Sequence, residues 1–360
     1  MTPTSTRHRL FQPRILLLTG ALSLSLAAFL AVPARPALAE GEQQFAALGN
    51  CKLDSGQEIE GCRLGYRTWG KLNPESTNAI LFPTWFGGTS KDIAGMIGEK
   101  GLADPAKYFV IVVDSLGNGL SSSPSNSKTQ PRMAFPVFTT RDMVRSEYRL
   151  VTESLHMKHL HAVMGISMGG IQTFEWMVDY PDFMDVAIPI VGTPRPSSYD
   201  LTLWQLEDDM IRSSPEWRNG EYETNPHIRL LTILGELSGS SPGHYAREVT
   251  RQAFPARYAS YSHANGAEFD INNRLYQLHA ILHHDVAEGG TMEDAAKRVR
   301  AKVFILPSQQ DHIVNPGPAL EFARLLNART MLLTSDCGHG APGCEADKVN
   351  PAVRAFLDGQ

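Results

Sequence analysis

The sequence predicts an α/β fold, with a mostly parallel sheet flanked by helices and interrupted by a helical lid insertion. Short apolar runs rich in β-forming residues alternate with stretches of helical spacing along most of the chain. These runs are apolar at nearly every position, as in strands that are buried on both faces. The alternation stops over residues 194–298, which are helical and polar and contain no run that would extend the sheet.

The first part of the predicted core, residues 40–193, contains five expected strands and two expected helices. Residues 59–68 alternate as an early strand does, and the runs AILFP (79–83) and YFVIVVD (108–114) are apolar and bounded by turn residues. Residues 139–155 have apolar side chains at helical spacing. A strand at 161–165, a helix at 169–180 and a strand at 186–191 follow.

The insertion is punctuated by tryptophan, proline and glycine at Trp204, Pro215, Trp217 and Gly220. The second part of the core, residues 299–360, then resumes the alternation with the run VFILP. We expect a strand at 303–307, a helix at 317–326 and a last strand at 330–334.

Composition and charge are those of a packed globular protein. Of the 360 residues, 42% are hydrophobic and 20% are charged, which excludes disordered, collagen-like and coiled-coil chains. Lys and Arg number 33 against 38 Asp and Glu, a net charge of −5. Because no basic field is available to hold a phosphate backbone, we expect no nucleic-acid partner.

Residues 1–39 have the pattern of a cleavable signal peptide. Arg7, Arg9 and Arg14 precede an apolar stretch at 15–32, and a small-x-small site ends at Ala39. Cleavage after Ala39 predicts a periplasmic or secreted protein with no stable membrane insertion. A retained anchor is the alternative, because an apolar stretch of this length can span a bilayer.

The four cysteines fall into two sequence-local pairs in the predicted exported part. Four cysteines allow three pairings. We favour Cys51 with Cys62 and Cys337 with Cys344, because each pair closes a short loop. Four free thiols are the alternative, and a zinc site is not expected because no C-x-x-C spacing occurs.

The strongest chemical signal is the sequence GISMG at residues 165–169. It follows an apolar strand and precedes a helical run, which is the setting of a nucleophile elbow. The small flanking residues suit a turn that holds its serine in a strained backbone angle. The motif therefore predicts Ser167 as a nucleophile.

A serine becomes nucleophilic when an imidazole takes its proton and an acid orients that imidazole. Asp311 follows the predicted strand 303–307, and His339 lies in the loop after the last strand, so both are placed at carboxyl ends of strands. Asp336 competes as the acid but is very near His339 in sequence, and His312 adjoins Asp311. The alternatives are a loop-capping role for Asp311 and a surface histidine at position 339.

Acyl transfer also requires N–H donors where negative charge develops on the carbonyl oxygen. One is the main-chain N–H of Met168, directly after the nucleophile. The second is expected from the loop TWFGG (84–88), at Phe86 first and Trp85 second. The alternative is a tight turn that is merely lined with aromatic residues.

The cysteine pair that brackets His339 suggests a further role, because a bridge there would restrict the loop that carries the imidazole. We treat this as a hypothesis about preorganisation.

A second cluster, His279, His283, His284 and Asp285, places histidines four apart, a spacing that can hold a metal. The glutamate of an H-E-x-x-H site is missing, so a helix end is the favoured interpretation and no metal is expected. No Walker or G-x-G-x-x-G sequence appears, so no nucleotide cofactor is expected either.

Several of these stretches together resemble the homoserine O-acetyltransferase branch of the α/β-hydrolase superfamily. They are Leu116-Gly117, Phe135-Pro136, residues 139–144 (TTRDMV), 165–172 (GISMGGIQ), Glu175-Trp176, 180–182 (YPD), Asp311 and Gly338-His339. The resemblance implies an α/β-hydrolase fold, a triad of Ser167, Asp311 and His339, and an acyl group carried on Ser167. It also implies a homodimer formed through the insertion.

The chain departs from that family at positions that hold the acceptor. Gly340 stands where the family usually has an aspartate, Thr232 aligns with its substrate arginine while Arg229 lies three residues away, and TWFGG replaces its His-Ala-Leu-Thr-Gly loop. We therefore predict an exported serine-dependent hydrolase acting on a small-molecule ester or related acyl compound. The alternatives are an O-acyltransferase with a changed acceptor and a catalytically silent binding module.

Overall fold

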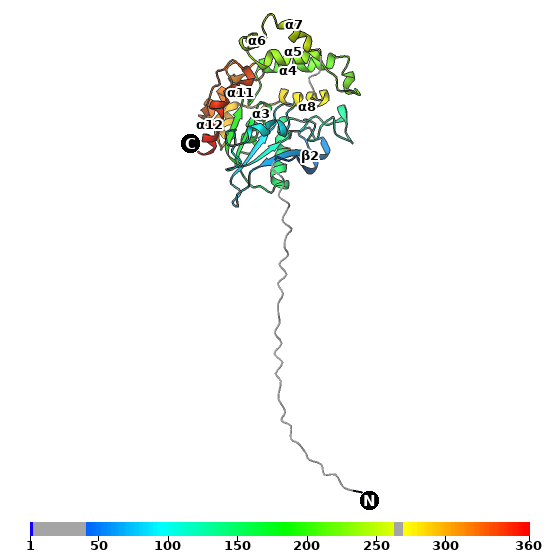
Figure 1. Cartoon of the computed structure of the whole chain (residues 1–360), viewed down its shortest axis with the longest axis vertical. Coiled ribbons are helices and arrows are strands. Elements are labelled where there is room, and N and C mark those ends of the chain that lie inside the picture. The colour runs from blue at the N-terminus through cyan, green and yellow to red at the C-terminus, as the bar shows by residue number, and fades with distance from the viewer. Residues whose placement is uncertain (3–40, 263–268) are drawn as a thin grey trace. The chain divides into compact units, whose positions relative to one another are not determined.

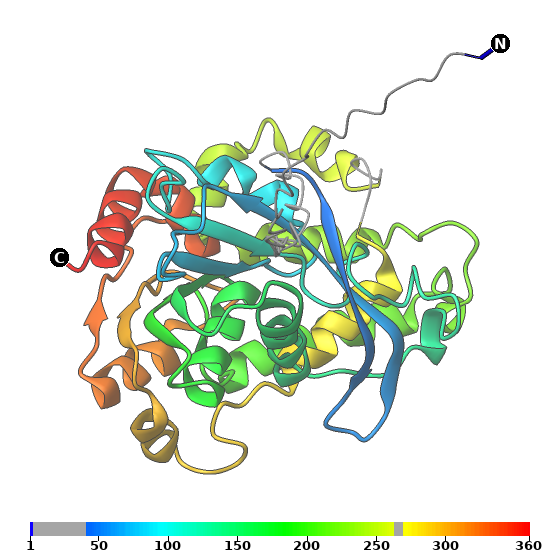
Figure 2. The ribbon, with the colours of Figure 1, turned by 90° about the horizontal axis from the view of Figure 1, so that it is seen from below.

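An eight-stranded sheet is the frame on which the other elements are placed (Figures 1 and 2). The structure is a computed structural model that describes residues 1–2, 41–262 and 269–360. The predicted signal peptide lies outside the described residues, apart from its first two positions. In spatial order the strands are β1 (Gln44–Lys52), β2 (Glu58–Trp69), β4 (Phe109–Val113), β3 (Ala79–Pro83), β5 (Leu160–Ile166), β6 (Met184–Ile190), β7 (Lys302–Ile305) and β8 (Arg329–Thr330).

The sheet is mostly parallel, as predicted. β1 with β2 and β2 with β4 are antiparallel, and every later pairing from β4–β3 to β7–β8 is parallel. The carboxyl ends of the parallel strands therefore lie at one edge of the sheet, where ligands bind in open α/β folds.

Two strands differ from the sequence prediction. β1 was not predicted, because its sequence QFAALGNCK is poor in β-branched residues; its side chains nevertheless alternate between buried and exposed. The last predicted strand, 330–334, overlaps β8 at one residue only, and a single bridge from Ser308 to Leu333 follows it. Both residues of β8 are exposed at the sheet edge, where an irregular strand loses little burial.

Helices cover both faces of the sheet. They are α1 (Ser90–Ile93), α2 (Thr140–Arg149), α3 (Met168–Asp179), α10 (Pro316–Leu326), α11 (Ala341–Cys344) and α12 (Ala346–Leu357). Successive residues of β3 point to opposite faces, so Leu81 belongs to the apolar cluster that contains Phe174 of α3, while Ile80 belongs to the cluster that contains Val353 of α12.

Between β6 and β7 the chain forms α4 (Ser198–Ser213), α5 (Arg229–Gly239), α6 (Pro242–Glu248), α7 (Phe254–Ser260), α8 (Ile271–Leu282) and α9 (Met292–Arg298). The described residues of this insertion, between β6 and β7, contain no strand. Figure 1 shows α4 to α7 gathered over one end of the sheet, with α8 beneath them. The boundaries proposed for the insertion, 194 and 298, stay a prediction.

Two disulfides have the pairing favoured from the sequence. Cys51–Cys62 joins β1 to β2, and Cys337–Cys344 closes the loop around His339. Within the described ranges, no helix has both the length and the apolar character that crossing a bilayer requires.

Candidate active site

Ser167 occupies a sharp turn between β5 and α3. Its backbone has φ 57° and ψ −121°, a left-handed conformation that costs energy for any residue with a side chain. The Ser167 N–H donates to the carbonyl of Ile190 at 2.9 Å, and its own carbonyl accepts from the N–H of Ile171 at 2.8 Å. The strand on one side and the helix on the other thus hold the strained residue in place.

The glycines of the motif are required by close backbone contacts. A Cβ at Gly165 would lie 2.2 Å from the carbonyl oxygen of Gly169, and a Cβ at Gly169 would lie 2.4 Å from the carbonyl oxygen of Pro83. Neither position can hold a side chain unless the backbone moves. The G-x-S-x-G spacing is therefore a packing requirement of this turn.

Three side chains that are far apart in the sequence meet at the turn. The His339 Nε2 atom lies 2.8 Å from the Ser167 Oγ, and the His339 Nδ1 atom lies 2.7 Å from an oxygen of Asp311. Because a carboxylate can only accept, the ring carries its proton on Nδ1, and Nε2 accepts from the serine hydroxyl. The structure thus brings together the three residues that the sequence singled out.

Asp311 is buried and is held by its other oxygen. That oxygen accepts from the N–H groups of Ile313 at 2.8 Å and Val314 at 2.9 Å. The carboxylate therefore accepts hydrogen bonds on both oxygens, from two main-chain donors on one and from the imidazole on the other.

The loop that carries His339 has its own supports. Ser308 donates its hydroxyl to the carbonyl of Gly338 at 2.7 Å, and Glu345 accepts from the N–H groups of Thr334 and Ser335, each at 2.8 Å. Burial raises the pKa of Glu345, but the donors at Ser335 and Lys348 lower it by more. Nothing in the sequence pattern had pointed to Glu345 or Ser308.

The competing residues lie elsewhere. Asp336 pairs with His244 of α6, at 3.3 Å from Nδ1, and with Arg247, at 2.5 Å. His312 packs its ring against Tyr199, with 6.4 Å between centroids. Asp311 is thus the acid at His339, and Asp336 links the histidine loop to the insertion.

Met168 and Phe86, the residues expected to supply the oxyanion donors, line the same cavity as Ser167 and His339. Met168 is the first residue of α3, where a main-chain N–H has no acceptor within the helix. In the loop 84–88, Gly87 donates to the side chain of Gln277 at 2.8 Å, while the N–H groups of Trp85 and Phe86 have no hydrogen-bond acceptor among the described residues. Phe86 and Trp85 both remain candidates for the second donor.

The cavity at this site has a volume of about 470 Å³. Its walls come from the ends of the strands, from α4, α5 and α8, and from the histidine loop, and most of them are apolar. A cavity of this volume is suited to a small-molecule ligand. Two charged residues on its wall, Glu207 and Arg274, were not predicted, because a residue inside a helical insertion carries no motif that marks it.

The histidines of the HAILHHD segment lie in the last turn of α8 and directly after it. The rings of His279 and His283 lie 4.0 Å apart, and burial followed by the charge of His283 lowers the pKa of His279 to about 4. The His284 ring is buried, with Nδ1 3.3 Å from a carboxylate oxygen of Glu175.

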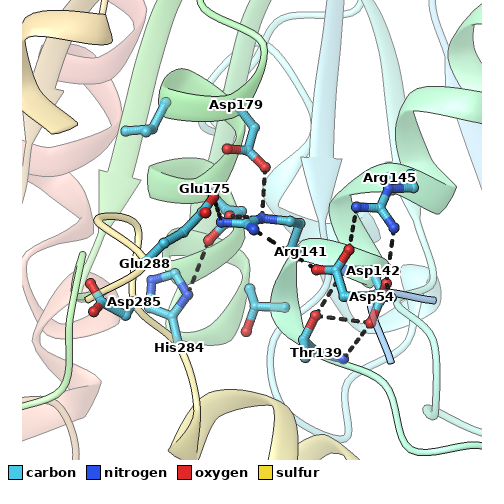
Figure 3. Close-up of polar contacts among 12 residues, drawn as sticks. Asp54, Thr139, Arg141, Asp142, Arg145, Glu175, Asp179, His284, Asp285 and Glu288 are labelled. Carbon is cyan, nitrogen blue, oxygen red and sulfur yellow. Dashed lines mark hydrogen bonds and ion pairs between the residues drawn. The ribbon is translucent and has the colours of Figure 1, made fainter. Parts of the chain in front are cut away.

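The TTRDMV stretch belongs to the same polar network (Figure 3). Arg141 lies 3.2 Å from Glu175 and 3.1 Å from Asp179, and it also pairs with Glu288. Burial raises the pKa of Glu175, but His284 and Arg141 lower it by more. The network ties α2 and α3 to the segment that follows α8.

One group of metal-ligand side chains occurs among the residues that the structure describes, namely His244, Asp336 and Cys337. The sulfur of Cys337 is bonded to Cys344, so it is not a thiolate ligand.

Comparisons with known proteins agree with the fold. Residues 80–342 match the family model described as alpha/beta hydrolase fold. A probable esterase of Corynebacterium glutamicum is 33% identical over 285 residues, covering 76% of this chain and 82% of the relative. A homoserine O-acetyltransferase of Pelobacter propionicus is 32% identical, covering 88% and 96%, and an ethyl acetate hydrolase of Pseudomonas veronii is 32% identical, covering 84% and 91%.

Solved structures of similar proteins have the same fold. An acetylester hydrolase from Corynebacterium glutamicum superposes with a TM-score of 0.81 at 28% identity, covering 88% of this chain and 96% of that one. The acetyl esterase MekB superposes with a TM-score of 0.81 at 31% identity, covering 89% and 97%. The chain therefore belongs to the alpha/beta hydrolase fold family, in the branch that contains the homoserine O-acetyltransferases and related esterases.

Proposed function

We propose that the protein is an exported serine-dependent hydrolase that cleaves an ester or related acyl compound through an acyl-enzyme on Ser167. The observation that carries the proposal is the continuous chain of contacts from the Ser167 hydroxyl to His339, at 2.8 Å, and on to Asp311, at 2.7 Å. These are the distances over which a proton is transferred between a nucleophile and its base.

The reaction follows from that geometry. His339 takes the hydroxyl proton as the Ser167 oxygen attacks the carbonyl carbon, and Asp311 stabilises the imidazolium that forms. The N–H groups of Met168 and Phe86 donate to the oxyanion. The tetrahedral intermediate collapses when His339 gives its proton to the leaving alcohol. Water then attacks the acyl-enzyme, with His339 again as the base, and releases the acid.

This chemistry needs neither a metal nor a nucleotide cofactor, because the serine supplies the nucleophile, the imidazole takes and gives every proton, and the carboxylate stabilises the imidazolium. The relatives named ethyl acetate hydrolase and probable esterase support water as the acceptor.

Transfer of the acyl group to an alcohol is the second candidate, because relatives are named homoserine O-acetyltransferase. The wall of the cavity favours water instead. Gly340 lines the cavity where the family usually has an aspartate, and α5 contributes Leu234, Gly235 and Ser238 to the wall. Arg229 of the same helix stacks on the ring of Tyr258, with Cζ 4.4 Å from the centroid.

Export is proposed from the leader pattern at 1–39, and the two disulfides are consistent with an oxidising compartment. The homodimer through the insertion, implied by the family, is likewise a proposal. Leu230 and Leu237, both on α5, have exposed fractions of 54% and 57% and offer it an apolar surface.

A fluorophosphonate probe tests the enzymatic assignment. We expect the wild-type protein to be labelled and Ser167→Ala to remain unlabelled. A wild-type protein that is folded but unlabelled would instead support the silent binding module.

Product partition separates hydrolysis from transfer. Purified protein is offered 4-nitrophenyl esters of graded acyl length, with and without added alcohols such as homoserine. Free acid as the main product, at every alcohol concentration tested, supports the hydrolase. Acylated alcohol as the main product would support the transferase.

A further inference from the structure

An ion pair lies on the wall of the otherwise apolar cavity. Arg274 of α8 donates through its Nε atom to a carboxylate oxygen of Glu207, which comes from α4. Apart from His339, these two are the only ionisable side chains that line the cavity among residues 41–262 and 269–360. The charge that a substrate meets there is therefore set by this pair.

The guanidinium lies over the ring of a residue that lines the same cavity as Ser167 and His339. Its Cζ atom is 5.2 Å from the centroid of the Phe86 ring, and Phe86 belongs to the loop expected to bind the oxyanion. Arg274 alone would therefore place a positive charge on the wall of the cavity that Ser167 and His339 also line. An unpaired cation at that position would attract carboxylates, which the reaction itself produces.

Glu207 removes that attraction. The exposed fractions of the two side chains are 13% for Glu207 and 26% for Arg274, so the pair is only partly reached by solvent. A substrate carboxylate approaching Arg274 would have to displace Glu207 or lie beside it as a like charge, and both are unfavourable in a mostly apolar cavity. An uncharged ester meets neither cost.

Resting on the proposed function, we propose that Glu207 is a specificity-determining residue, which neutralises Arg274 and so makes the site select uncharged esters over esters that carry a carboxylate. The discrimination is thus achieved by a repulsive group as well as by apolar contacts.

The test compares two esters of matched shape in the full chain. One is the 4-nitrophenyl monoester of glutaric acid, which carries a carboxylate, and the other is 4-nitrophenyl 5-methylhexanoate, which is uncharged. We expect Glu207→Gln to raise the ratio of kcat/KM for the anionic ester to kcat/KM for the uncharged ester by about tenfold. A hydrogen bond from an unpaired cation to the substrate carboxylate strengthens binding by about this factor.

The matched control is Asp208→Asn on the same helix. Asp208 pairs with Arg212 at 2.5 Å and is absent from the cavity wall, so we expect this variant to leave the ratio unchanged. Arg274→Gln serves as a second variant with the opposite sign, since it leaves Glu207 unpaired and should lower the ratio. A ratio that moves in neither Glu207→Gln nor Arg274→Gln would overturn the proposal, as would an equal change in Asp208→Asn.

Binding gives a readout that does not depend on turnover. Calorimetry compares valerate with valeramide in the wild type, Glu207→Gln and Asp208→Asn, and we expect only Glu207→Gln to gain affinity for valerate relative to valeramide, again by about tenfold. If the wild type hydrolyses neither ester but this gain is observed, the proposed function fails and the role of Glu207 stands. If the esters are hydrolysed but neither ratio nor affinity moves, the role of Glu207 alone fails.

Discussion

Replacing Asp311 by asparagine should remove activity by reversing one hydrogen bond. The Asp311 oxygen that faces the main chain accepts from the N–H groups of Ile313 and Val314, so an asparagine must turn its carbonyl oxygen toward those donors. Its NH₂ group then faces the Nδ1 atom of His339. The imidazole must accept there, which moves its proton to Nε2, and Nε2 can no longer accept from Ser167.

The expected loss follows from the role of this tautomer. An imidazole held in the wrong tautomer loses about four orders of magnitude in kcat, or about 5 kcal/mol of barrier. The assay is the kcat for a 4-nitrophenyl ester, with the thermal midpoint measured in parallel. Because asparagine keeps the shape of Asp311 and its two main-chain contacts, the fold should persist. A variant with kcat within tenfold of the wild type would show that Asp311 does not fix the tautomer of His339.

Three further changes test other parts of the structure. Burial raises the pKa of Glu147 from 4.5 to about 8, so the folded state binds the Glu147 proton more tightly than the unfolded chain does. The free energy of unfolding should therefore fall by about 3 kcal/mol as the pH rises from 5 to 8. In urea unfolding, Glu147→Gln should lack this part of the pH dependence, and an unchanged pH dependence would contradict the burial argument. The double variant Cys337→Ser with Cys344→Ser should lose about 2–3 kcal/mol of stability and part of the turnover, because the bridge closes a loop of seven-residue separation around His339; full turnover and an unchanged thermal midpoint would remove the preorganisation hypothesis. Light scattering should give twice the chain mass for the wild type and a smaller mass for Leu237→Glu, and a monomeric wild type would exclude the homodimer.

The architecture was predictable where burial leaves a clear pattern. The runs AILFP and YFVIVVD become β3 and β4, because strands that are covered on both faces must be apolar throughout. β1 could not be predicted in the same way, since its strand character comes from pairing with β2 and from a disulfide to it. Contacts with β2, and not the local sequence of β1, therefore determine that these residues form a strand.

The meeting of Ser167, Asp311 and His339 was predictable because each of them follows a strand. Parallel strands place their carboxyl ends at one edge of the sheet, so the order of the segments around Ser167, Asp311 and His339 was enough to predict that these side chains meet. The pairing of Glu207 with Arg274 was not predictable, because these residues come from α4 and α8 and no local sequence pattern indicates how the two helices pack. Their meeting depends on how the insertion folds over the sheet.

The most direct test is to trap the covalent intermediate. The protein is mixed with an excess of a 4-nitrophenyl ester, quenched in acid within milliseconds and examined by mass spectrometry of its peptides. We expect one added acyl group on the peptide that contains Ser167, and none in Ser167→Ala. Turnover of the ester with no acyl group on that peptide, or with the group on another residue, would contradict this expectation.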